Sequence, residues 1–295
     1  MRGPETAAGG GAPRPRPVRR EFPVATDYDV IVIGARVAGA STAMLLARRG
    51  HRVLMVERAT MPSDVVSTHA ILRSGILQLT RWGVIDRVIA AGTPPVREIT
   101  LGFGPERIPI RVKAEYGIDT LYGPRRHILD SILVEAAQES GVDFADRTRM
   151  VDLVRGDQGQ LGGIVTSHRG REVAVSSRMV IGADGVWSRT ASLVEAGSYE
   201  SHPATNAVTY AYYQDIDVPG FWFQFTPGVN AGIIPTNEGL CCVFAGRSND
   251  RMAEFRADSE TEFYRLLRHA GADIAERVSA GSRASQFRGT KGLPG

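Results

Sequence analysis

Cysteine is nearly absent from this chain, whose 295 residues include only two, Cys241 and Cys242. Because the two are adjacent, they supply neither a disulfide framework nor the ligand spacing of a zinc site. Long apolar runs are missing too, since none approaches the ~18 residues of a membrane-spanning helix. The sequence therefore predicts no metal, no integral membrane segment and a reducing, cytoplasmic setting.

The chain also lacks a large excess of positive or negative residues. The 35 Lys and Arg residues nearly balance the 32 Asp and Glu residues, for a formal net charge of +3. Much of the basic excess lies in the Pro- and Gly-rich residues 1–26, which lack the apolar core of a secretory signal. We expect residues 1–26 to form a disordered tail, and we predict no nucleic-acid partner.

One stretch, DVIVIGARVAGASTAMLLARRGHRVLMVER from Asp29 to Arg58, carries a recognisable layout. An apolar run typical of a buried parallel strand precedes a glycine turn. A helix is expected over residues 38–49, and a second buried strand over residues 52–56. Strand, turn, helix, strand and a final acid form the layout of a dinucleotide-binding unit.

The glycine turn departs from the usual G-x-G-x-x-G pattern at one position. Gly34 permits the tight turn, and Gly39 lets the helix pack closely on the sheet. Arg36 stands where the second glycine normally lets phosphates approach the backbone. The site works only if the Arg36 side chain points away from the ligand or turns to donate to a phosphate.

The residues around this turn complete the predicted site. Ala38 belongs to the helix N-terminus, whose free N–H groups suit a pyrophosphate. Glu57, followed by Arg58, ends the second strand, where an acid accepts hydrogen bonds from ribose hydroxyls. Loss of Glu57 is expected to weaken binding and to leave the fold intact. The alternative is an ordinary βαβ unit with a chance pair of glycines.

Helical and strand patterns alternate up to about residue 200, and strand patterns dominate afterwards. This predicts an α/β fold: a Rossmann-like nucleotide domain with a second α+β domain built on an antiparallel sheet. We assign residues 27–95 and 120–200 to the first domain, and 96–119 and 201–295 to the second. The expected helices cover 71–83, 84–92, 127–141, the end of 178–194, and about 259–271. The expected strands cover 142–145, 150–154, 163–168, 172–176, the start of 178–194, 206–216, 221–226, 230–236 and 239–246, with a hairpin over 97–112.

A second motif, GADGVWSRT from Gly182 to Thr190, follows a buried strand. It resembles the Asp-Gly motif of flavoprotein aromatic hydroxylases of the para-hydroxybenzoate hydroxylase type. The resemblance implies that Asp184 and Gly185 lie near the pyrophosphate of FAD, in a region also linked to the pyridine nucleotide. This motif argues against an NAD-linked dehydrogenase that uses the glycine turn alone.

Two further segments match the same superfamily. VERATMPSDVVSTHAI is similar to the ribose acid and the loop that runs along the flavin, and YGPRRHILDSILVEAA resembles the Arg-x-x-Leu start of a helix. That match implies that Arg126, with Arg125 as the fallback, approaches FAD. The turn and its following loop look closest to the branch of the geranylgeranyl reductases, where an arginine in the turn is a familiar variant. The resemblance covers roughly residues 28–289.

A third signature of this family is missing. Its Gly-Asp pair opens a helix beyond the second-domain sheet, and its aspartate holds the ribityl chain. The only Gly-Asp pair here, Gly156-Asp157, falls in a loop between expected short strands. We therefore expect a C-terminally truncated chain, without the family's last helix, that holds FAD weakly or not at all.

Candidate substrate residues lie on the late strands and in the flavin-side loop. Tyr210, Tyr212 and Gln214 share one strand face, as do Trp222 and Gln224 on the next strand. These side chains either line a pocket or simply fill the core. His69 is either a donor near the flavin or an ordinary loop histidine. No catalytic acid or base is named, because no hydrolase or metal motif is present.

The resemblance implies a FAD-dependent oxidoreductase that uses NAD(P)H as a transient reductant. The first hypothesis is a monooxygenase that uses molecular oxygen to hydroxylate a small aromatic or polycyclic substrate. The second is a reductase of isoprenoid double bonds. The third is an inactive nucleotide-binding fragment.

Overall fold

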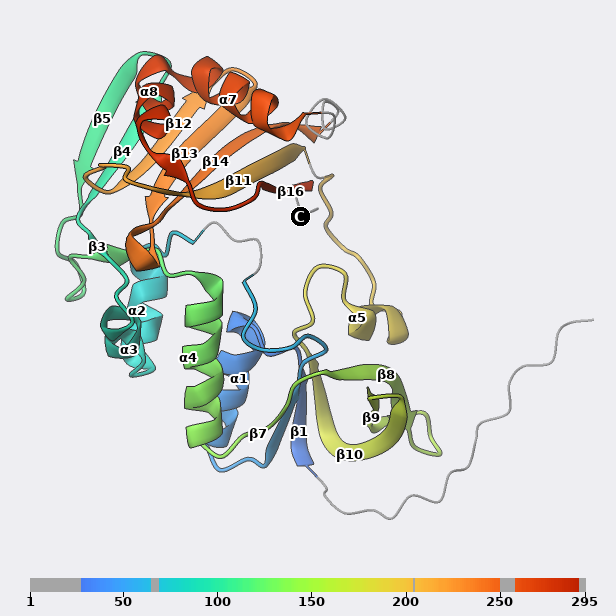
Figure 1. The fold of residues 1–295 in the computed structure, drawn as a ribbon. Helices are drawn as coiled ribbons and strands as arrows, with labels where there is room; N and C mark the ends of the chain where they lie inside the picture. Colours follow the sequence, from blue (N-terminus) through green and yellow to red (C-terminus); the bar gives the residue numbers. More distant parts are fainter. Residues whose placement is uncertain (1–27, 65–68, 204, 250–257, 292–295) are drawn as a thin grey trace, which may run out of the picture.

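The computed structural model describes residues 28–64, 69–203, 205–249 and 258–291. The tail expected over residues 1–26 lies outside the described residues. Figure 1 shows two layered halves joined by several crossings of the chain: a sheet covered by α1 and α4, and a second sheet covered by α7 and α8. These halves give the predicted fold class, an α/β nucleotide half and a second half built on a sheet.

The first sheet has six strands in the order β7-β2-β1-β10-β9-β8. Its centre is β1, whose last four residues are buried, as its apolar sequence predicts. On either side β1 pairs in parallel with β2 and β10, and β2 pairs in parallel with β7. The strands are β1 (Tyr28–Ile33), β2 (Val53–Val56), β7 (Asp143–Ala145), β8 (Thr148–Arg155), β9 (Leu161–His168) and β10 (Arg171–Gly182).

The long strand β10 differs from the sequence prediction, which divides it into strands at 172–176 and at the start of 178–194. Its first part pairs antiparallel with β9, and its second part pairs parallel with β1 from Ser177 onward. Neither Gly nor Pro separates the two parts, so nothing interrupts the extended backbone. One strand therefore links the β8–β9–β10 meander to the parallel sheet.

The longer helices of the nucleotide half are α1 (Val37–Ala47), α2 (Arg73–Arg81), α3 (Ile85–Ala90) and α4 (Arg126–Glu139). The small residues of α1, among them Ala40 and Ala43, are fully buried and bring the helix close to its neighbours. Helix α4 buries Leu129 and Leu133 in the same core. Close packing of α1 sets the position of its N-terminus at the end of β1.

The second sheet has eight strands, with the path β15-β11-β14-β13-β12-β4-β5 and β16 paired to β11. The hairpin β4–β5 joins this sheet because β4 pairs in parallel with β12, far along the chain. The strands are β4 (Glu98–Phe103), β5 (Glu106–Arg111), β11 (Asn206–Gln214), β12 (Phe221–Thr226), β13 (Val229–Pro235), β14 (Cys241–Ser248), β15 (Ser282–Arg283) and β16 (Arg288–Lys291). The domain boundaries themselves stay a prediction.

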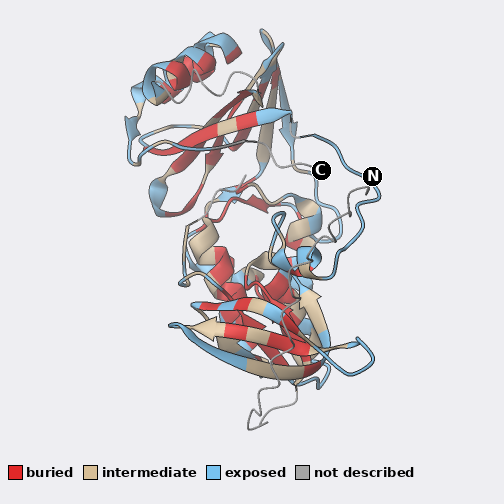
Figure 2. Cartoon of the chain, turned by 90° about the vertical axis from the view of Figure 1, so that its right-hand side faces the viewer, coloured by how far each residue is buried: buried red, intermediate tan, exposed pale blue. Residues whose placement is uncertain are grey.

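The two faces of this sheet have different neighbours. Helices α7 (Ser259–Ala270) and α8 (Ala272–Ala280) cover one face and share a core with Tyr213. The other face, which carries Tyr210 and Phe221, forms a separate core with Leu121. Figure 2 shows buried residues in both the strands and the helices of the two halves. Each face of the second sheet is thus packed, and only one contacts elements of the nucleotide half.

The remaining elements are short: β3 (Pro95–Val96), β6 (Leu121–Tyr122), α5 (Arg189–Leu193) and the 3-10 helix η1 (Asn237–Gly239). Among the described residues, no helix is both long and apolar enough to cross a membrane.

Candidate functional site

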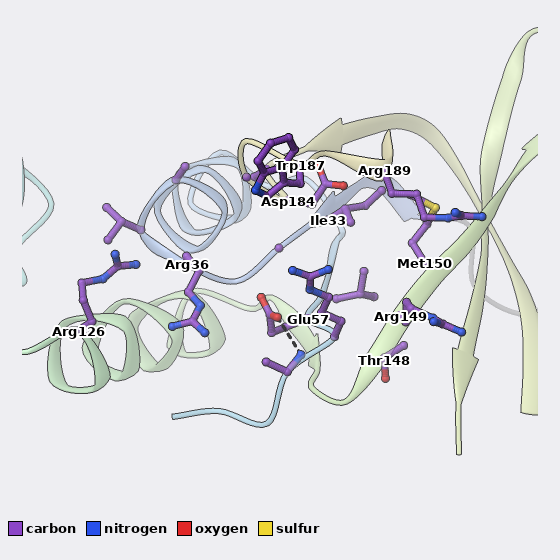
Figure 3. A pocket seen from close by; sticks show the side chains of 18 residues that line it. Ile33, Arg36, Glu57, Arg126, Thr148, Arg149, Met150, Asp184, Trp187 and Arg189 are labelled. Carbon is purple, nitrogen blue, oxygen red and sulfur yellow. Dashed lines mark hydrogen bonds between the residues drawn. The ribbon is translucent and has the colours of Figure 1, made fainter. Parts of the chain in front are cut away.

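A cavity of about 500 Å³ opens at the carboxyl ends of β1 and β2, beside the N-terminus of α1. In open α/β sheets this edge is where ligands bind. All the predicted cofactor residues except Gly39 line the cavity: Gly34, Arg36, Ala38, Glu57, Arg58, Arg126, Asp184 and Gly185. Figure 3 shows them around one space, although they come from four separate parts of the chain.

The two glycines of the turn are required by close contacts. Gly34 has φ +100°, and a Cβ there would lie 2.4 Å from the carbonyl oxygen of Ala183. A Cβ on Gly39 would lie 1.8 Å from the carbonyl oxygen of Gly34. Gly39 therefore lies beneath the turn and supports it, and does not line the cavity.

The N-terminus of α1 offers backbone donors to the cavity. Arg36 precedes the helix in an extended conformation and makes no side-chain cap hydrogen bond. The first-turn N–H groups of a helix have no partner within the helix. Val37 and Ala38 line the cavity at this point. The combination of free donors and a positive helix end fits a pyrophosphate.

The Arg36 side chain turns away from these donors. Its Nη1 donates to the carboxylate of Asp130 on α4 at 2.9 Å. Nη1 and Nη2 also donate to the carbonyl and hydroxyl oxygens of Ser63, at 3.1 and 2.7 Å. This direction corresponds to the first of the two alternatives given by the sequence, but Arg36 also lines the cavity, so its role toward a ligand stays a prediction. Asp130 was missed by sequence reasoning, although it stands four residues after Arg126.

Glu57 is buried, with 7% of its surface exposed. Its carboxylate accepts a hydrogen bond from the N–H of Ala35 at 3.0 Å and another from the N–H of Ala59 at 2.9 Å. Glu57 therefore holds the glycine turn in place before any ribose arrives. Removal of Glu57 would take this acceptor from both N–H groups, so we expect some loss of stability in addition to the weaker binding that the sequence predicts.

The Asp184-Gly185 turn is held by its own hydrogen bonds. The Asp184 carboxylate accepts from the hydroxyl of Ser188 at 2.6 Å and from the N–H of Thr190 at 3.1 Å. Burial favours a raised pKa for Asp184, but these donors outweigh it and hold the pKa below its usual value. Gly185 has φ +88°, a conformation that favours glycine.

Other residues of the cavity wall were missed by sequence reasoning. Trp187 lines the cavity within the second motif, although 78% of its surface is exposed. Arg189 donates to the carbonyl oxygen of Val151 at 2.6 Å. Arg149 and Met150 approach from β8. Only Trp187 and Arg189 had a signal in the sequence, because they lie inside the GADGVWSRT motif.

A second cavity of about 310 Å³ adjoins the first. Val37 and Arg126 line both cavities. The remaining lining of the second cavity is mostly apolar and includes Ile71, Leu79 and Trp82. Arg126 is held by Asp130 through hydrogen bonds of 3.0 to 3.2 Å. Its guanidinium therefore borders both cavities.

The fallback residue, Arg125, faces elsewhere. It donates to Asp64 at 2.6 Å and to Glu238 at 2.7 Å. Its guanidinium carbon lies 4.4 Å from the ring centre of Tyr212. Arg126, and not Arg125, therefore lines the cavities.

His69 and the two tyrosines are brought together between the halves. His69 lines the second cavity, is 3% exposed, and has a left-handed backbone with φ +57°. Its Nε2 lies 2.8 Å from the hydroxyl of Tyr212, and the ring of Tyr210 lies edge-on. Burial lowers the pKa of His69 to about 4 and raises the pKa of Tyr212. Both groups are therefore neutral at pH 7.

Trp222 and the two glutamines lie apart from this group. Trp222 and Gln224 face α7 and α8, because the pairing of Trp222 with Ile233 directs it into the helix-covered core. Gln214 is exposed at the end of β11. The structure therefore does not bring Trp222 together with the tyrosines, as the pocket prediction does. Within the described residues, no group of three or more His, Cys, Asp or Glu could hold a metal ion.

Comparison with known proteins gives a family match over most of the chain. The family described as "FAD binding domain" matches residues 27–284. The digeranylgeranylglycerophospholipid reductase 1 of Methanococcoides burtonii is 26% identical over 269 residues, 88% of this chain and 64% of the reductase. The aklavinone 12-hydroxylase of Streptomyces peucetius subsp. caesius is 31% identical over 177 residues, 54% of this chain and 36% of the hydroxylase. The chain spans less than two thirds of either relative.

Solved structures share the fold. The myxobacterial chondrochloren halogenase CndH, a FAD-dependent halogenase, has a TM-score of 0.79 at 22% identity, covering 90% of this chain and 64% of the halogenase. PqsL of Pseudomonas aeruginosa, a probable FAD-dependent monooxygenase, has a TM-score of 0.74 at 20% identity, covering 90% of this chain and 73% of PqsL. Likeness at this identity shows a common architecture and leaves the reaction open.

Proposed function

The chain belongs to the FAD-binding domain family, and on that premise we propose that it is a FAD-dependent oxidoreductase. More specifically, we propose an NAD(P)H-dependent monooxygenase that hydroxylates a small aromatic or polycyclic substrate with molecular oxygen. We assign residues 27–95 and 120–200 to cofactor binding, and 96–119 and 201–295 to the substrate. The two free, buried cysteines are compatible with a reducing compartment such as the cytoplasm.

The observation that carries the proposal is the first cavity, in which backbone donors, a buried acid and an arginine surround one space. The N-terminus of α1 and the Gly34 turn suit the pyrophosphate of FAD. Glu57 and Asp184-Gly185 line the same cavity, and we propose that Glu57 would hold the adenosine ribose and that Asp184-Gly185 would border the phosphates. Arg126 lines both cavities and suits the side of the phosphates that faces the flavin.

When bound, FAD supplies the redox chemistry, taking electrons from NAD(P)H and delivering them to oxygen or substrate. The chain's own residues bind, orient and exclude water. The wall of the second cavity, which includes Leu79 and Trp82, is mostly apolar and offers few hydrogen-bond partners to water. The hydroxyl of Tyr212 and Nε2 of His69 share one hydrogen bond of 2.8 Å. We propose that this pair provides or accepts a proton at Tyr212 Oη during turnover.

An aromatic substrate is supported by the sheet face that meets the nucleotide half. Tyr210, Tyr212, Phe221 and Phe223 carry aromatic rings there. Flat rings prefer edge-on or offset contacts with such side chains. The similarity to a hydroxylase over 54% of the chain agrees with this choice.

A reductase of isoprenoid-type double bonds is the second candidate. The similarity to the archaeal reductase extends over 88% of the chain, further than the similarity to the hydroxylase. Reduction of a double bond needs a proton donor as well as electrons, and the Tyr212–His69 pair could serve there too.

The two candidate functions differ in whether the reaction consumes oxygen. The purified chain is loaded with FAD, supplied with NADH or NADPH, and offered phenolic, polycyclic and polyprenyl substrates in labelled dioxygen. The monooxygenase proposal predicts a product that contains one labelled oxygen atom. A product with two added hydrogens, formed equally well without oxygen, would replace it by the reductase. A chain that binds FAD but oxidises no NAD(P)H with any of these substrates would favour the inactive nucleotide-binding fragment.

A further inference from the structure

A two-residue segment, Ser63–Asp64, lies where three parts of the molecule meet. Arg36 in the glycine turn donates to the carbonyl and hydroxyl oxygens of Ser63. Arg125 at the start of α4 donates to the Asp64 carboxylate at 2.6 Å. Arg288 in β16 donates to the carbonyl oxygen of Asp64 at 3.0 Å. Three arginines from distant parts of the chain therefore fix one short segment.

The contacts continue from this segment to the substrate sheet. The Arg125 side chain, 16% exposed, pairs with the Asp64 carboxylate, 14% exposed. Burial at this level protects the pair from the screening that weakens surface ion pairs. The same guanidinium stacks on the ring of Tyr212, whose hydroxyl meets His69. A continuous path of contacts thus joins the phosphate turn to the second cavity.

The Asp64 carboxylate is charged, as its pairing with Arg125 in this path of contacts requires. Burial favours a raised pKa for Asp64, but the hydrogen bond and charge of Arg125 outweigh it, so the pKa lies below its usual value. His127 adds a nitrogen 3.6 Å from the other carboxylate oxygen. The carboxylate is therefore charged at neutral pH and stays paired with Arg125.

Arg36 is the end of this path at the cofactor turn. Its guanidinium is fixed at two points, by Ser63 and by the fully buried carboxylate of Asp130 on α4. A planar guanidinium can bind two partners in a fixed geometry, which neither glycine nor lysine can do.

We propose that Arg36 is a positioning residue that fixes the Ser63–Asp64 segment to the phosphate turn and thereby sets where the Tyr212–His69 pair stands against the second cavity. The proposal rests on the proposed FAD site, and it concerns the flavin side of that site. The adenosine diphosphate part of the ligand needs the turn itself, for which glycine at position 36 is fully suitable.

The test compares FAD with ADP in the full chain. Arg36→Gly restores the usual glycine pattern, and we expect it to weaken FAD binding at least tenfold while ADP binding changes less than threefold. Arg36→Lys is expected to behave like Arg36→Gly, because a compact ammonium lacks the planar fork that holds Ser63 and Asp130 in one fixed geometry. Asp64→Asn breaks the next contact on the path and should give the same selective loss. Glu139→Gln on α4, which breaks an exposed ion pair with Arg87 of α3, is the matched control and should change the binding of neither ligand.

Two results would overturn the proposal. If Arg36→Gly binds FAD as tightly as the unmodified chain, the arginine positions nothing. If FAD and ADP lose affinity equally, Arg36 acts on the phosphate turn itself. A ligand-free readout separates this proposal from the proposed function: amide hydrogen exchange of the peptide 57–64 should quicken at least fivefold in Arg36→Gly and stay unchanged in Glu139→Gln. An unmodified chain that binds ADP but no FAD would overturn the proposed function, and the exchange measurement would still decide the role of Arg36.

Discussion

The residues that line the two adjoining cavities come together in different ways. The first is lined by glycines, charged groups and apolar residues, most of which lie within a few residues of the ends of β1, β2 and β10; Arg126 and the start of β8 are the exceptions. The second is made mainly of side chains from α2, α4 and the loop at His69, which lie far apart in the sequence and meet when the nucleotide half folds. The difference shows that the phosphate end of this site is specified locally, and that the flavin and substrate end is specified by tertiary packing.

The largest expected effect comes from adding a side chain beneath the glycine turn of the first cavity. Gly39→Val should lower the free energy of unfolding by roughly 3 kcal/mol, because its Cβ collides with the carbonyl oxygen of Gly34. FAD binding should be lost with it. Gly197→Val is the matched control, since no heavy atom lies within 4 Å of its added Cβ. Equal urea midpoints for the two variants would show that close packing beneath the turn is unimportant.

At the second cavity, the buried side chain of His69 should make the stability of the fold depend on pH. Burial lowers its pKa from 6.5 to about 4, so the unfolded chain binds a proton in this window and the folded chain does not. Stability is therefore complete above about pH 6.5 and falls by roughly 2–3 kcal/mol as the pH drops toward 4. The groups facing His69 are Asp64, Arg125, Arg126 and His127.

The check is the free energy of unfolding at several pH values between 4 and 6.5. His69→Asn should flatten this dependence, and asparagine tolerates the left-handed backbone at this position. An equally steep dependence in His69→Asn would assign the effect to another group.

At the glycine turn of the first cavity, Glu57→Ala should destabilise the ligand-free chain by about 2 kcal/mol, because the buried N–H groups of Ala35 and Ala59 lose their acceptor. FAD affinity should fall as well. Glu57→Gln keeps one acceptor oxygen and should lie between Glu57→Ala and the unmodified chain. Thermal denaturation without FAD decides the point: an unchanged midpoint for Glu57→Ala would make the acid a pure ribose ligand.

The smallest effects distinguish the two faces of the second sheet. Tyr212→Phe removes the hydrogen bond to His69 and should cost about 1 kcal/mol of stability together with a clear loss of turnover. Trp222→Phe, on the helix-covered face, should cost about the same stability and leave turnover unchanged. Steady-state kinetics of the loaded protein separate them. Equal loss of turnover in both would mean that the face of the sheet is irrelevant.

The same division explains how much could be predicted from the sequence. The glycine turn, Glu57 and Asp184 belong to short motifs whose geometry follows from the local backbone, and each was found where the cavity is. Asp130 could not be foreseen as the partner of Arg36, because 94 positions separate them. The Tyr212–His69 bond spans 143 positions. The strand pattern placed Trp222 and Gln224 on one face but could not say which, since pairing with β13 decides the face.

The central claim is that one cavity, centred on the Gly34–Gly39 turn, holds FAD by its pyrophosphate. The most direct measurement is a titration of the purified chain with FAD, followed by flavin fluorescence, with ADP as competitor and with Gly39→Val and Gly197→Val in parallel. The account predicts saturable one-to-one binding that ADP displaces, that Gly197→Val retains, and that Gly39→Val abolishes. FAD binding that ADP cannot displace, or that survives in Gly39→Val, would contradict it.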